Sequence, residues 1–426
     1  MRKFYTATLG CKINQYETRS VSEAWSASGA LEVQDEAEAD VILVNSCAVT
    51  ANAVADLRRL VRRLHRDNPQ AEIIVTGCAA QVAADEVAEL PGVQRLVPHK
   101  DKAVLLEGLD SVGHVSSEKV FPAFSVSGYG RSRAVVKVQD GCSHRCTYCI
   151  VPLARGASVS RPTGDVLDEI RRLLDAGFRE MVLSGVNLRQ FGRDLPEKPD
   201  FWDLLGEIEA RFGHEWKGRA RLRISSLEPG QLGEKALAVL ADSSLVAPQL
   251  HLSLQSGDSE VLRRMGRGHY RPEQALEFLE RLRDVWPVFG LGADLLTGFP
   301  GETGAEFENG LEFCRKLPLS YAHVFPFSPR PDTPAAEMDG QLPGNVKKDR
   351  AKRLREVAAK GKADFLEKLL RLPELSVLVQ DGEGRGVSEY YASCRIENPS
   401  SSASPKRLVR CAPVRVEDGV IICKES

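Results

Sequence analysis

Three cysteines near the middle of the chain are spaced for a metal cluster. They are Cys142, Cys146 and Cys149, and they follow an apolar run, Ala134–Val138, that predicts a β-strand. Thiolates separated by three and then two residues on one loop all reach one small iron–sulfur cluster, yet they leave its fourth iron without a protein ligand. The sequence therefore predicts a [4Fe–4S] site with one iron open to a small molecule.

This spacing resembles that of the radical S-adenosylmethionine (SAM) superfamily, in which SAM chelates the open iron and one-electron reduction cleaves it to a 5′-deoxyadenosyl radical. Tyr148 matches the aromatic residue that commonly precedes the third cysteine. A zinc site completed by His144 is the alternative, because that histidine lies within the same loop. Barrel enzymes place their chemistry at the carboxyl ends of strands, which favours the cluster here.

Three further cysteines are far apart in the sequence, but each comes shortly after a predicted strand. They are Cys11, Cys47 and Cys78. Because the carboxyl ends of parallel strands lie at one edge of a sheet, we expect these thiols to converge into a second three-cysteine site. The alternative is that each is a small buried hydrophobe, a common fate of a free cysteine. The remaining four, which show no such pattern and are interpreted as structural, are Cys314, Cys394, Cys411 and Cys423.

The elements that position these cysteines indicate an α/β protein of three units. Residues 1–100 show a β-α-β-α-β order, which predicts a parallel sheet. Residues 128–355 alternate strands with amphipathic helices and predict a full or partial (β/α) barrel, and residues 370–426 predict a small β domain. A looser connection is expected at 96–130. The six barrel strands are expected at Ala134–Val138, Glu180–Ser184, Arg221–Ser225, Gln249–Leu254, Leu291–Leu296 and Tyr321–Pro326.

Composition narrows the class of protein. The chain has 426 residues and a formal net charge of -2, so no global positive field marks it as a nucleic-acid binder. No apolar run is long enough for a membrane span, and the first residues lack the features of a signal peptide. These features predict a cytoplasmic protein without a membrane partner, in which 10 cysteines serve metal or redox chemistry rather than disulfides.

Six motifs together resemble the methylthiotransferase family of radical SAM enzymes, and they span nearly the whole chain. They are TLGCKINQYET (Thr8–Thr18), NSCAVT (Asn45–Thr50), TGCAAQ (Thr76–Gln81), GCSHRCTYCIVPLARG (Gly141–Gly156), LSLQSG (Leu252–Gly257) and TGFPGET (Thr297–Thr303). The resemblance implies an amino-terminal methylthiotransferase domain, a radical SAM partial barrel and a TRAM-like, RNA-binding carboxyl-terminal domain.

The same resemblance implies the cofactors and their ligands. Cys142, Cys146 and Cys149 match the ligands of the radical [4Fe–4S] cluster. The ligands of an auxiliary [4Fe–4S] cluster, which holds or delivers the sulfur, are matched by Cys11, Cys47 and Cys78. One SAM is expected to donate a methyl group and a second to supply the radical. The electron donor and the sulfur source are expected to be external.

The segment around Lys12 is most similar to the branch that modifies threonylcarbamoyladenosine at position 37 of tRNA, in the anticodon loop. The expected reaction converts C2–H of that adenine into C2–SCH3. The same chemistry on isopentenyladenosine or on a ribosomal-protein aspartate remains an alternative. A non-catalytic iron–sulfur RNA-binding protein or redox sensor, and a zinc-binding RNA module, are alternatives of a different class.

Two further sets of residues are candidate binding groups. SAM contacts are expected from residues at or near strand ends, although each also fits ordinary turn chemistry: Tyr148, Gly185, Asn187, Gln255 and Asp294. RNA contacts are expected from a basic helical stretch beside the β domain: Lys347, Lys348, Arg350, Lys352 and Arg353. A second basic helix, with arginines between Arg58 and Arg66, is more simply a solvated face.

Overall fold

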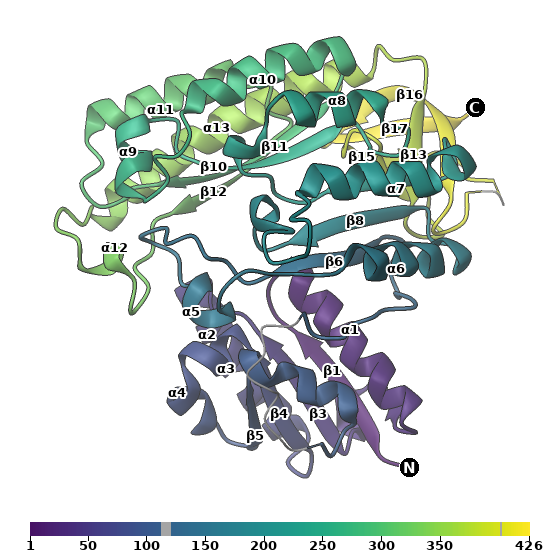
Figure 1. Ribbon diagram of the computed structural model, residues 1–426, viewed down its shortest axis with the longest axis vertical. Coiled ribbons are helices and arrows are strands. Elements are labelled where there is room, and N and C mark those ends of the chain that lie inside the picture. Colours follow the sequence, from purple (N-terminus) through teal and green to yellow (C-terminus); the bar gives the residue numbers. More distant parts are fainter. Residues whose placement is uncertain (112–120, 401–402) are drawn as a thin grey trace.

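The computed structural model describes residues 1–111, 121–400 and 403–426, which form three connected units (Figure 1). The amino-terminal unit is a parallel sheet in the order β2-β1-β3-β4-β5. Its strands are β1 (Lys3–Thr8), β2 (Leu31–Glu32), β3 (Val41–Ser46), β4 (Glu72–Gly77) and β5 (Val93–Pro98). Its helices are α1 (Lys12–Ala27), α2 (Ala51–Asp67), α3 (Cys78–Val82) and α4 (Ala84–Ala88).

The central strand β3 explains why its sequence is a continuous apolar run. Ile42 and Val44 pack with α2 in one core, while Val41 and Leu43 pack with α1 in another. A parallel strand covered by helices on both faces has no solvent side, so it needs no alternating polar residues. The predicted β-α-β-α-β order is therefore present, with β2 and β5 added at the sheet edges.

The connection after this sheet is more ordered than its Gly- and Ser-rich sequence suggests. Strand β5 occupies its beginning, and a 3₁₀ helix, η2 (His99–Glu107), follows. Leu105, Phe124 and Val126 are buried in the core beneath α1. Residues 121–130 contain no helix or strand, as expected of a looser connection, although single apolar residues of this segment are packed; residues 112–120 lie outside the described residues.

The second unit is a partial (β/α) barrel, open between its first and last strands. All six predicted strands are present: β6 (Ala134–Asp140), β8 (Glu180–Gly185), β9 (Arg221–Ile224), β10 (Gln249–Gln255), β11 (Gly290–Thr297) and β12 (Tyr321–Pro326). They pair in parallel as β6-β8-β9 and β10-β11-β12, and two isolated parallel bridges, Leu222–Val246 and Leu227–Leu252, join the segments around β9 and β10. The short strand β7 (Val159–Ser160) pairs with the outer edge of β6. Strands β6 and β12 are therefore not hydrogen-bonded to each other, and the amino-terminal unit lies beside this barrel (Figure 1).

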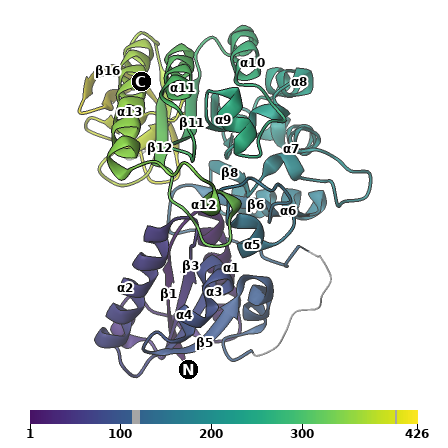
Figure 2. The ribbon, with the colours of Figure 1, turned by 90° about the vertical axis from the view of Figure 1, so that its left-hand side faces the viewer.

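Helices cover the outside of this barrel and one short helix covers its cysteine loop. The outer helices are α6 (Thr163–Asp175), α7 (Phe201–Trp216), α8 (Glu234–Asp242), α9 (Ser259–Arg264), α10 (Pro272–Val285) and α11 (Gly304–Lys316). The short α12 (Pro334–Glu337) lies between the two units (Figure 2). There, the Ala335 amide donates a hydrogen bond to the Thr147 carbonyl at 2.8 Å.

The carboxyl-terminal unit is a closed barrel that docks on β9. Its strands are β13 (Leu375–Val379), β14 (Arg385–Ser388), β15 (Ser393–Ile396), β16 (Leu408–Glu417) and β17 (Val420–Glu425). The long helix α13 (Gly344–Leu369) leads into it. Buried Glu180 pairs with Arg221 and Arg223, whose guanidiniums donate to backbone carbonyls of this unit. A shared buried carboxylate thus ties the two barrels together.

Within the described ranges, no helix combines the length and the apolarity that crossing a membrane requires.

Candidate active site

The three dispersed cysteines lie at the carboxyl edge of the amino-terminal sheet. Cys11 immediately precedes α1, Cys47 directly follows β3, and Cys78 begins α3 directly after β4. Because β1, β3 and β4 are adjacent strands, the structure brings the three residues together. Cys47 and Cys78 are buried, whereas Cys11 is exposed.

Close packing and electrostatics show how near these thiols are to each other. A Cβ on Gly10 would lie 2.6 Å from the Cβ of Cys47, so only glycine allows the Cys11 loop to approach Cys47 this closely. Burial raises the pKa of Cys47 and of Cys78, and proximity to Cys11 raises both further. The positive charge of Arg155 opposes both shifts. Three convergent thiols beside a cation fit a metal cluster, which would hold them as thiolates.

The second cysteine set lies on the loop between β6 and the short helix α5 (Val151–Arg155). The Sγ of Cys142 accepts a hydrogen bond from Asn187 Nδ2 at 3.6 Å, and the Sγ of Cys146 accepts one from the Arg267 guanidinium at 3.7 Å. Burial raises the pKa of Cys149 to about 12 and raises that of Cys142. Burial acts to raise the pKa of Cys146, but His144 and Arg267 outweigh burial and lower that pKa. Donors aimed at sulfur fit cluster-bound thiolates.

The two cysteine sets belong to one site. Helix α3, which begins at Cys78, packs against α5, which begins two residues after Cys149. Burial opposes the rise in the pKa of Arg155 at the end of α5, Asp140 and Glu17 are the main groups that raise it, and Cys78 and Cys11 add to this effect. Two three-thiol sites therefore meet at the interface between the amino-terminal unit and the open barrel.

Gly141 is a backbone requirement of the loop that carries Cys142, Cys146 and Cys149. Its φ is +65°, and a Cβ there would lie 2.0 Å from the Ala157 carbonyl oxygen. We expect Gly141→Ala to displace the loop and to lower the iron content of the reconstituted protein by up to about half, since one of the two three-thiol sets loses its geometry. Gly164→Ala is the matched control, because nothing lies within 4 Å of its added Cβ. Equal iron in both variants would show that the loop tolerates the side chain.

A buried carboxylate organises the cations around the same loop. Glu228 lies 3.1 Å from both Arg267 and His269, 3.4 Å from His144 and 3.5 Å from Arg189. Burial opposes ionisation of Glu228, but His144 and the other cations lower its pKa to about 2. Hydrogen bonds to Cys146 and Glu228 raise the pKa of His144 to about 9. His144, the candidate zinc ligand, is thus engaged with this carboxylate, and no spacing pattern in the sequence marks Glu228 or Arg267.

The candidate SAM residues differ in their distance from the cysteine loop. Asn187 touches Cys142, and Gly185 at the end of β8 packs against Gln139, where a Cβ would lie 3.0 Å from Gln139 Oε1. Tyr148 is half-buried against the barrel core, and Gln255 ends β10 with a φ of +65°.

Asp294, the fifth candidate, lies within β11, which continues to Thr297, and not at the end of the strand. It is hydrogen-bonded to His251 and His323 on the neighbouring strands. Its position therefore indicates a place inside the barrel.

A network of buried charges joins the two units behind the thiols. Glu17 on α1 is fully buried and accepts hydrogen bonds from Lys102, Lys137 and Arg155. Lys137 and Arg155 also pair with Asp140 at the end of β6. Sequence reasoning missed this network, because its members are up to 138 residues apart and share no local pattern.

The five candidate RNA-binding residues lie on α13, but they are not equally available. Lys348 and Lys352 are exposed. Lys347 donates to the Phe327 carbonyl at 3.2 Å, and Arg353 pairs with Glu308. Arg350 is buried and donates to Glu302 at 2.6 Å. The prediction for Arg350 is therefore corrected: its guanidinium fixes α13 to the barrel and is not presented to RNA.

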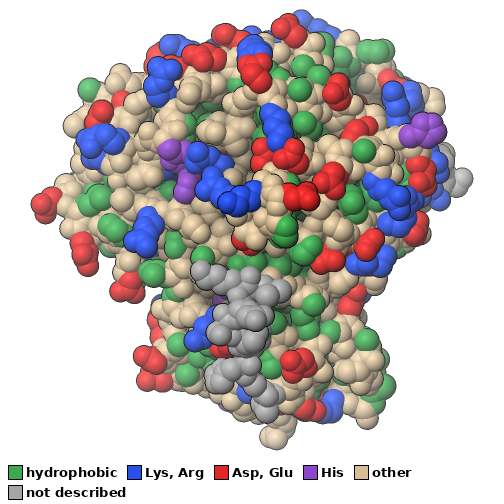
Figure 3. Space-filling view, viewed as in Figure 1, with side chains coloured by type: hydrophobic (Ala, Val, Ile, Leu, Met, Phe, Trp, Pro, Cys, Tyr) green, Lys and Arg blue, Asp and Glu red, His purple; other side chains and the backbone are tan. Residues whose placement is uncertain are grey.

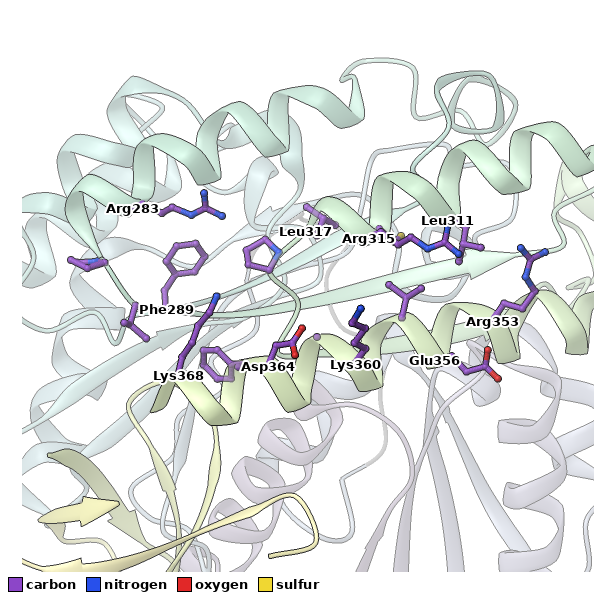
Figure 4. Close-up of a pocket in the computed structure, with 17 residues that line it drawn as sticks. Arg283, Phe289, Leu311, Arg315, Leu317, Arg353, Glu356, Lys360, Asp364 and Lys368 are labelled. Carbon is purple, nitrogen blue, oxygen red and sulfur yellow. The ribbon is translucent and has the colours of Figure 1, made fainter. Parts of the chain in front are cut away.

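One face of the surface carries mixed charge, and one cavity lies apart from both three-cysteine sets. Basic and acidic side chains are interspersed on the face in Figure 3, as the net charge suggests. A cavity of about 610 Å³ lies between α10, α11 and α13, with Phe289, Lys360 and Lys368 among its lining residues (Figure 4). Of the ten cysteines only Cys314 lines it, so it is separate from both three-cysteine sets.

Comparisons with known proteins agree with this architecture. Residues 3–98 match the family described as "Uncharacterized protein family UPF0004", and residues 136–314 match the radical SAM superfamily. In structure, the chain is similar to the radical SAM methyltransferase TsrM from Kitasatospora setae, with a TM-score of 0.60 over 79% of this chain and 74% of that one. At 16% identity this similarity concerns the fold alone.

Similar sequences identify the family. A Thermotoga maritima protein named threonylcarbamoyladenosine tRNA methylthiotransferase MtaB is 34% identical over 100% of this chain and 97% of its own length. A Rickettsia prowazekii protein of the same name is 36% identical over 82% and 81%. A Wolbachia protein named tRNA-2-methylthio-N(6)-dimethylallyladenosine synthase is 30% identical over 95% and 96%. The chain therefore belongs to the methylthiotransferase family of radical SAM enzymes.

Proposed function

We propose that this enzyme methylthiolates carbon 2 of threonylcarbamoyladenosine at position 37 of tRNA. The observation that carries the proposal is the meeting of two three-thiol sites at the mouth of one open barrel. Relatives named for this substrate are 34–36% identical, while those named for the dimethylallyl substrate are 30–32% identical. The similarity to the first group supports the choice of substrate.

The proposal assigns the two cysteine sets to two [4Fe–4S] clusters. Cys142, Cys146 and Cys149 would hold the radical cluster, and the auxiliary cluster would be held by Cys11, Cys47 and Cys78. When bound, the two clusters supply the one-electron reduction that cleaves SAM and the sulfur that is transferred. Asn187 and Arg267 hold two of the loop thiolates through hydrogen bonds to sulfur.

The protein's own residues prepare the space between the two sets. Arg155 supplies a fixed positive charge beside Cys78, which opposes the rise that burial causes in the pKa of that thiol. Glu228 keeps Arg267 and His144 oriented at the loop. Tyr148, Gly185, Asn187 and Gln255 are proposed as SAM contacts.

The proposal includes partners outside the chain. The substrate is the anticodon loop of tRNA, and the electron donor and sulfur source are separate molecules, all met in the cytoplasm. We propose that the closed carboxyl-terminal barrel is TRAM-like and binds RNA, with Lys348 and Lys352 as exposed cations on the adjoining helix. The mixed surface charge supports local contacts over a broad basic face.

The decisive test is nucleoside mass spectrometry of tRNA from cells with and without the gene. We expect the methylthio form of threonylcarbamoyladenosine to disappear and its unthiolated precursor to accumulate. An anaerobic assay with reconstituted protein and a modified anticodon stem–loop checks that the effect is direct. Loss of methylthio-isopentenyladenosine instead would transfer the protein to the sister substrate, and unchanged tRNA nucleosides would overturn the proposal.

A further inference from the structure

Two histidines and an aspartate meet on the inner face of the sheet β10-β11-β12. On these strands, Leu252, Ala293 and Val324 pack with the outer helices in one core. Successive side chains of a strand point to opposite faces, so the neighbouring residue on each strand faces the lumen of the barrel. These neighbours, called here the His–Asp–His trio, are His251, Asp294 and His323. Asp294 and His323 are direct partners in the register of β11 and β12.

The polar atoms of the trio converge at distances close to those of a metal site. Asp294 Oδ1 lies 3.0 Å from His251 Nε2 and 3.1 Å from His323 Nδ1. One ligand atom from each residue lies within 4.8 Å of the other two. Nitrogen and oxygen ligands of a tetrahedral zinc ion are about 3.4 Å apart, so the two contacts of Asp294 need to open by only about 0.3–0.4 Å. Two imidazoles and a carboxylate suit Zn²⁺ and similar divalent transition metals.

Neighbouring groups hold the His251 ring with its Nε2 toward Asp294. The Tyr321 hydroxyl lies 3.0 Å from His251 Nδ1 and accepts a hydrogen bond from Gln249 Nε2 at 3.1 Å. In metal sites, a hydrogen bond at one ring nitrogen fixes the tautomer and directs the other nitrogen to the ion. A Cβ on Gly292 of β11 would lie 2.5 Å from His251 Nδ1, so glycine leaves the room that this bond needs.

The carboxylate of the trio is not already neutralised by a lysine or an arginine. Two other groups of histidines and carboxylates are similarly close: His144–Glu228–His269 and Glu17–His99–Asp140. There, Glu228 pairs with Arg267, and Glu17 pairs with Lys102, so a metal ion would meet positive neighbours. Asp294 pairs with neither a lysine nor an arginine in the described ranges, and its ion-pair partners are the two histidines. The trio is therefore the most suitable of the three groups for a cation.

The trio is open on one side. His251 is buried, whereas the side chains of His323 and Asp294 are 57% and 22% exposed. Three protein ligands with an open side are the arrangement of zinc sites that bind water or a small ligand in the fourth position. The trio lies within strands and contains no cysteine, whereas the six clustered thiols all come after strand ends. It is therefore distinct from both three-thiol sets.

We propose that His251, Asp294 and His323 form a binding site for Zn²⁺ or a similar divalent transition-metal cation. The three side chains supply two nitrogen ligands and one oxygen ligand, and the open side takes water or an oxygen-bearing small molecule. Tyr321 is a positioning residue, since it acts on the ion through His251. The site goes beyond the proposed function and does not depend on which nucleoside the enzyme modifies.

Zinc binding to the reconstituted holoenzyme tests this site, because the clusters then occupy the thiols that would compete for the ion. We expect wild-type protein to retain a single zinc ion per chain after gel filtration. Its zinc X-ray absorption spectrum should show nitrogen and oxygen ligands at about 2.0–2.1 Å and no sulfur. Asp294→Asn should weaken zinc binding at least about a hundredfold, because loss of an outer-shell partner alone costs about 10–100-fold. Tyr321→Phe, which removes only the hydroxyl, should weaken it about tenfold.

His214→Gln is the matched control and should bind zinc as the wild type does, because His214 is exposed on α7. Wild-type holoenzyme that retains no zinc would overturn the site and leave the trio as a hydrogen-bonded group. A sulfur shell at about 2.3 Å, or undiminished binding in Asp294→Asn at normal iron content, would also overturn it. If Asp294→Asn does not fold, His323→Gln at the most exposed ligand gives the same test. Nucleoside mass spectrometry reads the proposed function separately, so the two can fail independently.

Discussion

Replacing Cys146 with alanine is expected to abolish SAM cleavage, whereas replacing Cys47 is expected to spare cleavage and stop methylthiolation. Cys146 is one of three thiols on the loop after β6, and its Sγ accepts a hydrogen bond from the Arg267 guanidinium. A cluster with two protein ligands does not keep the geometry that SAM needs. Loss of an outer-shell partner of a metal site typically costs 10–100-fold, so loss of a ligand should lower 5′-deoxyadenosine formation by more than about a hundredfold.

Cys47 lies on the other side of the interface, at the end of β3. Its loss should remove the auxiliary cluster and about half of the bound iron, while SAM cleavage remains within about threefold of wild type. Mass spectrometry of 5′-deoxyadenosine and of the modified nucleoside, with iron analysis of each variant, reads these effects separately. Cys314→Ala is the control, because Cys314 is buried in α11, apart from both sets. Loss of SAM cleavage in Cys47→Ala at normal radical-cluster iron would contradict the division of roles.

The positions of both cysteine sets were predictable from sequence because they depend on strand ends. Each thiol follows an apolar run, and parallel topology converts such positions into one edge. The six barrel strands were located for the same reason: buried parallel strands are long apolar runs. The short strands β14 and β15 escaped prediction, since four residues with a glycine or an arginine among them carry little pattern.

The residues that tune the site could not be predicted in this way. Arg267 reaches Cys146 across 121 positions, and Glu228 collects cations from three separate segments. Such contacts depend on how loops fold back over the barrel, and no periodicity encodes them. In the basic stretch on α13, the sequence predicted a contact that the structure does not present. Arg350 lies among surface cations in the sequence, but the packing of the helix directs its guanidinium to Glu302.

The largest expected effect on stability is that of Glu17→Gln. Glu17 is fully buried and is the only carboxylate that Lys102 contacts among the described hydrogen bonds. Burial lowers the pKa of Lys102, and Glu17 offsets only part of that effect. Breaking a buried pair by removing one partner typically costs about 3–5 kcal/mol, because the remaining charge is left uncompensated. In this variant Lys137 and Arg155 retain their ion pairs with Asp140, so Lys102 is the cation that is mainly left without a carboxylate partner.

We expect Glu17→Gln to lower the melting temperature of the reconstituted protein by roughly 5–10 °C. Glu234→Gln, which removes an exposed ion pair with Arg281, should change it little. Because Glu17 joins α1 to β6 and α5, the variant should also loosen the interface at which the two thiol sets meet, so auxiliary iron should be lost at lower temperature than radical-cluster iron. If Glu17→Gln has the same melting temperature as the wild type, Lys102 must release its proton at little cost in free energy. The network of buried charges would then align the two units and would not stabilise them.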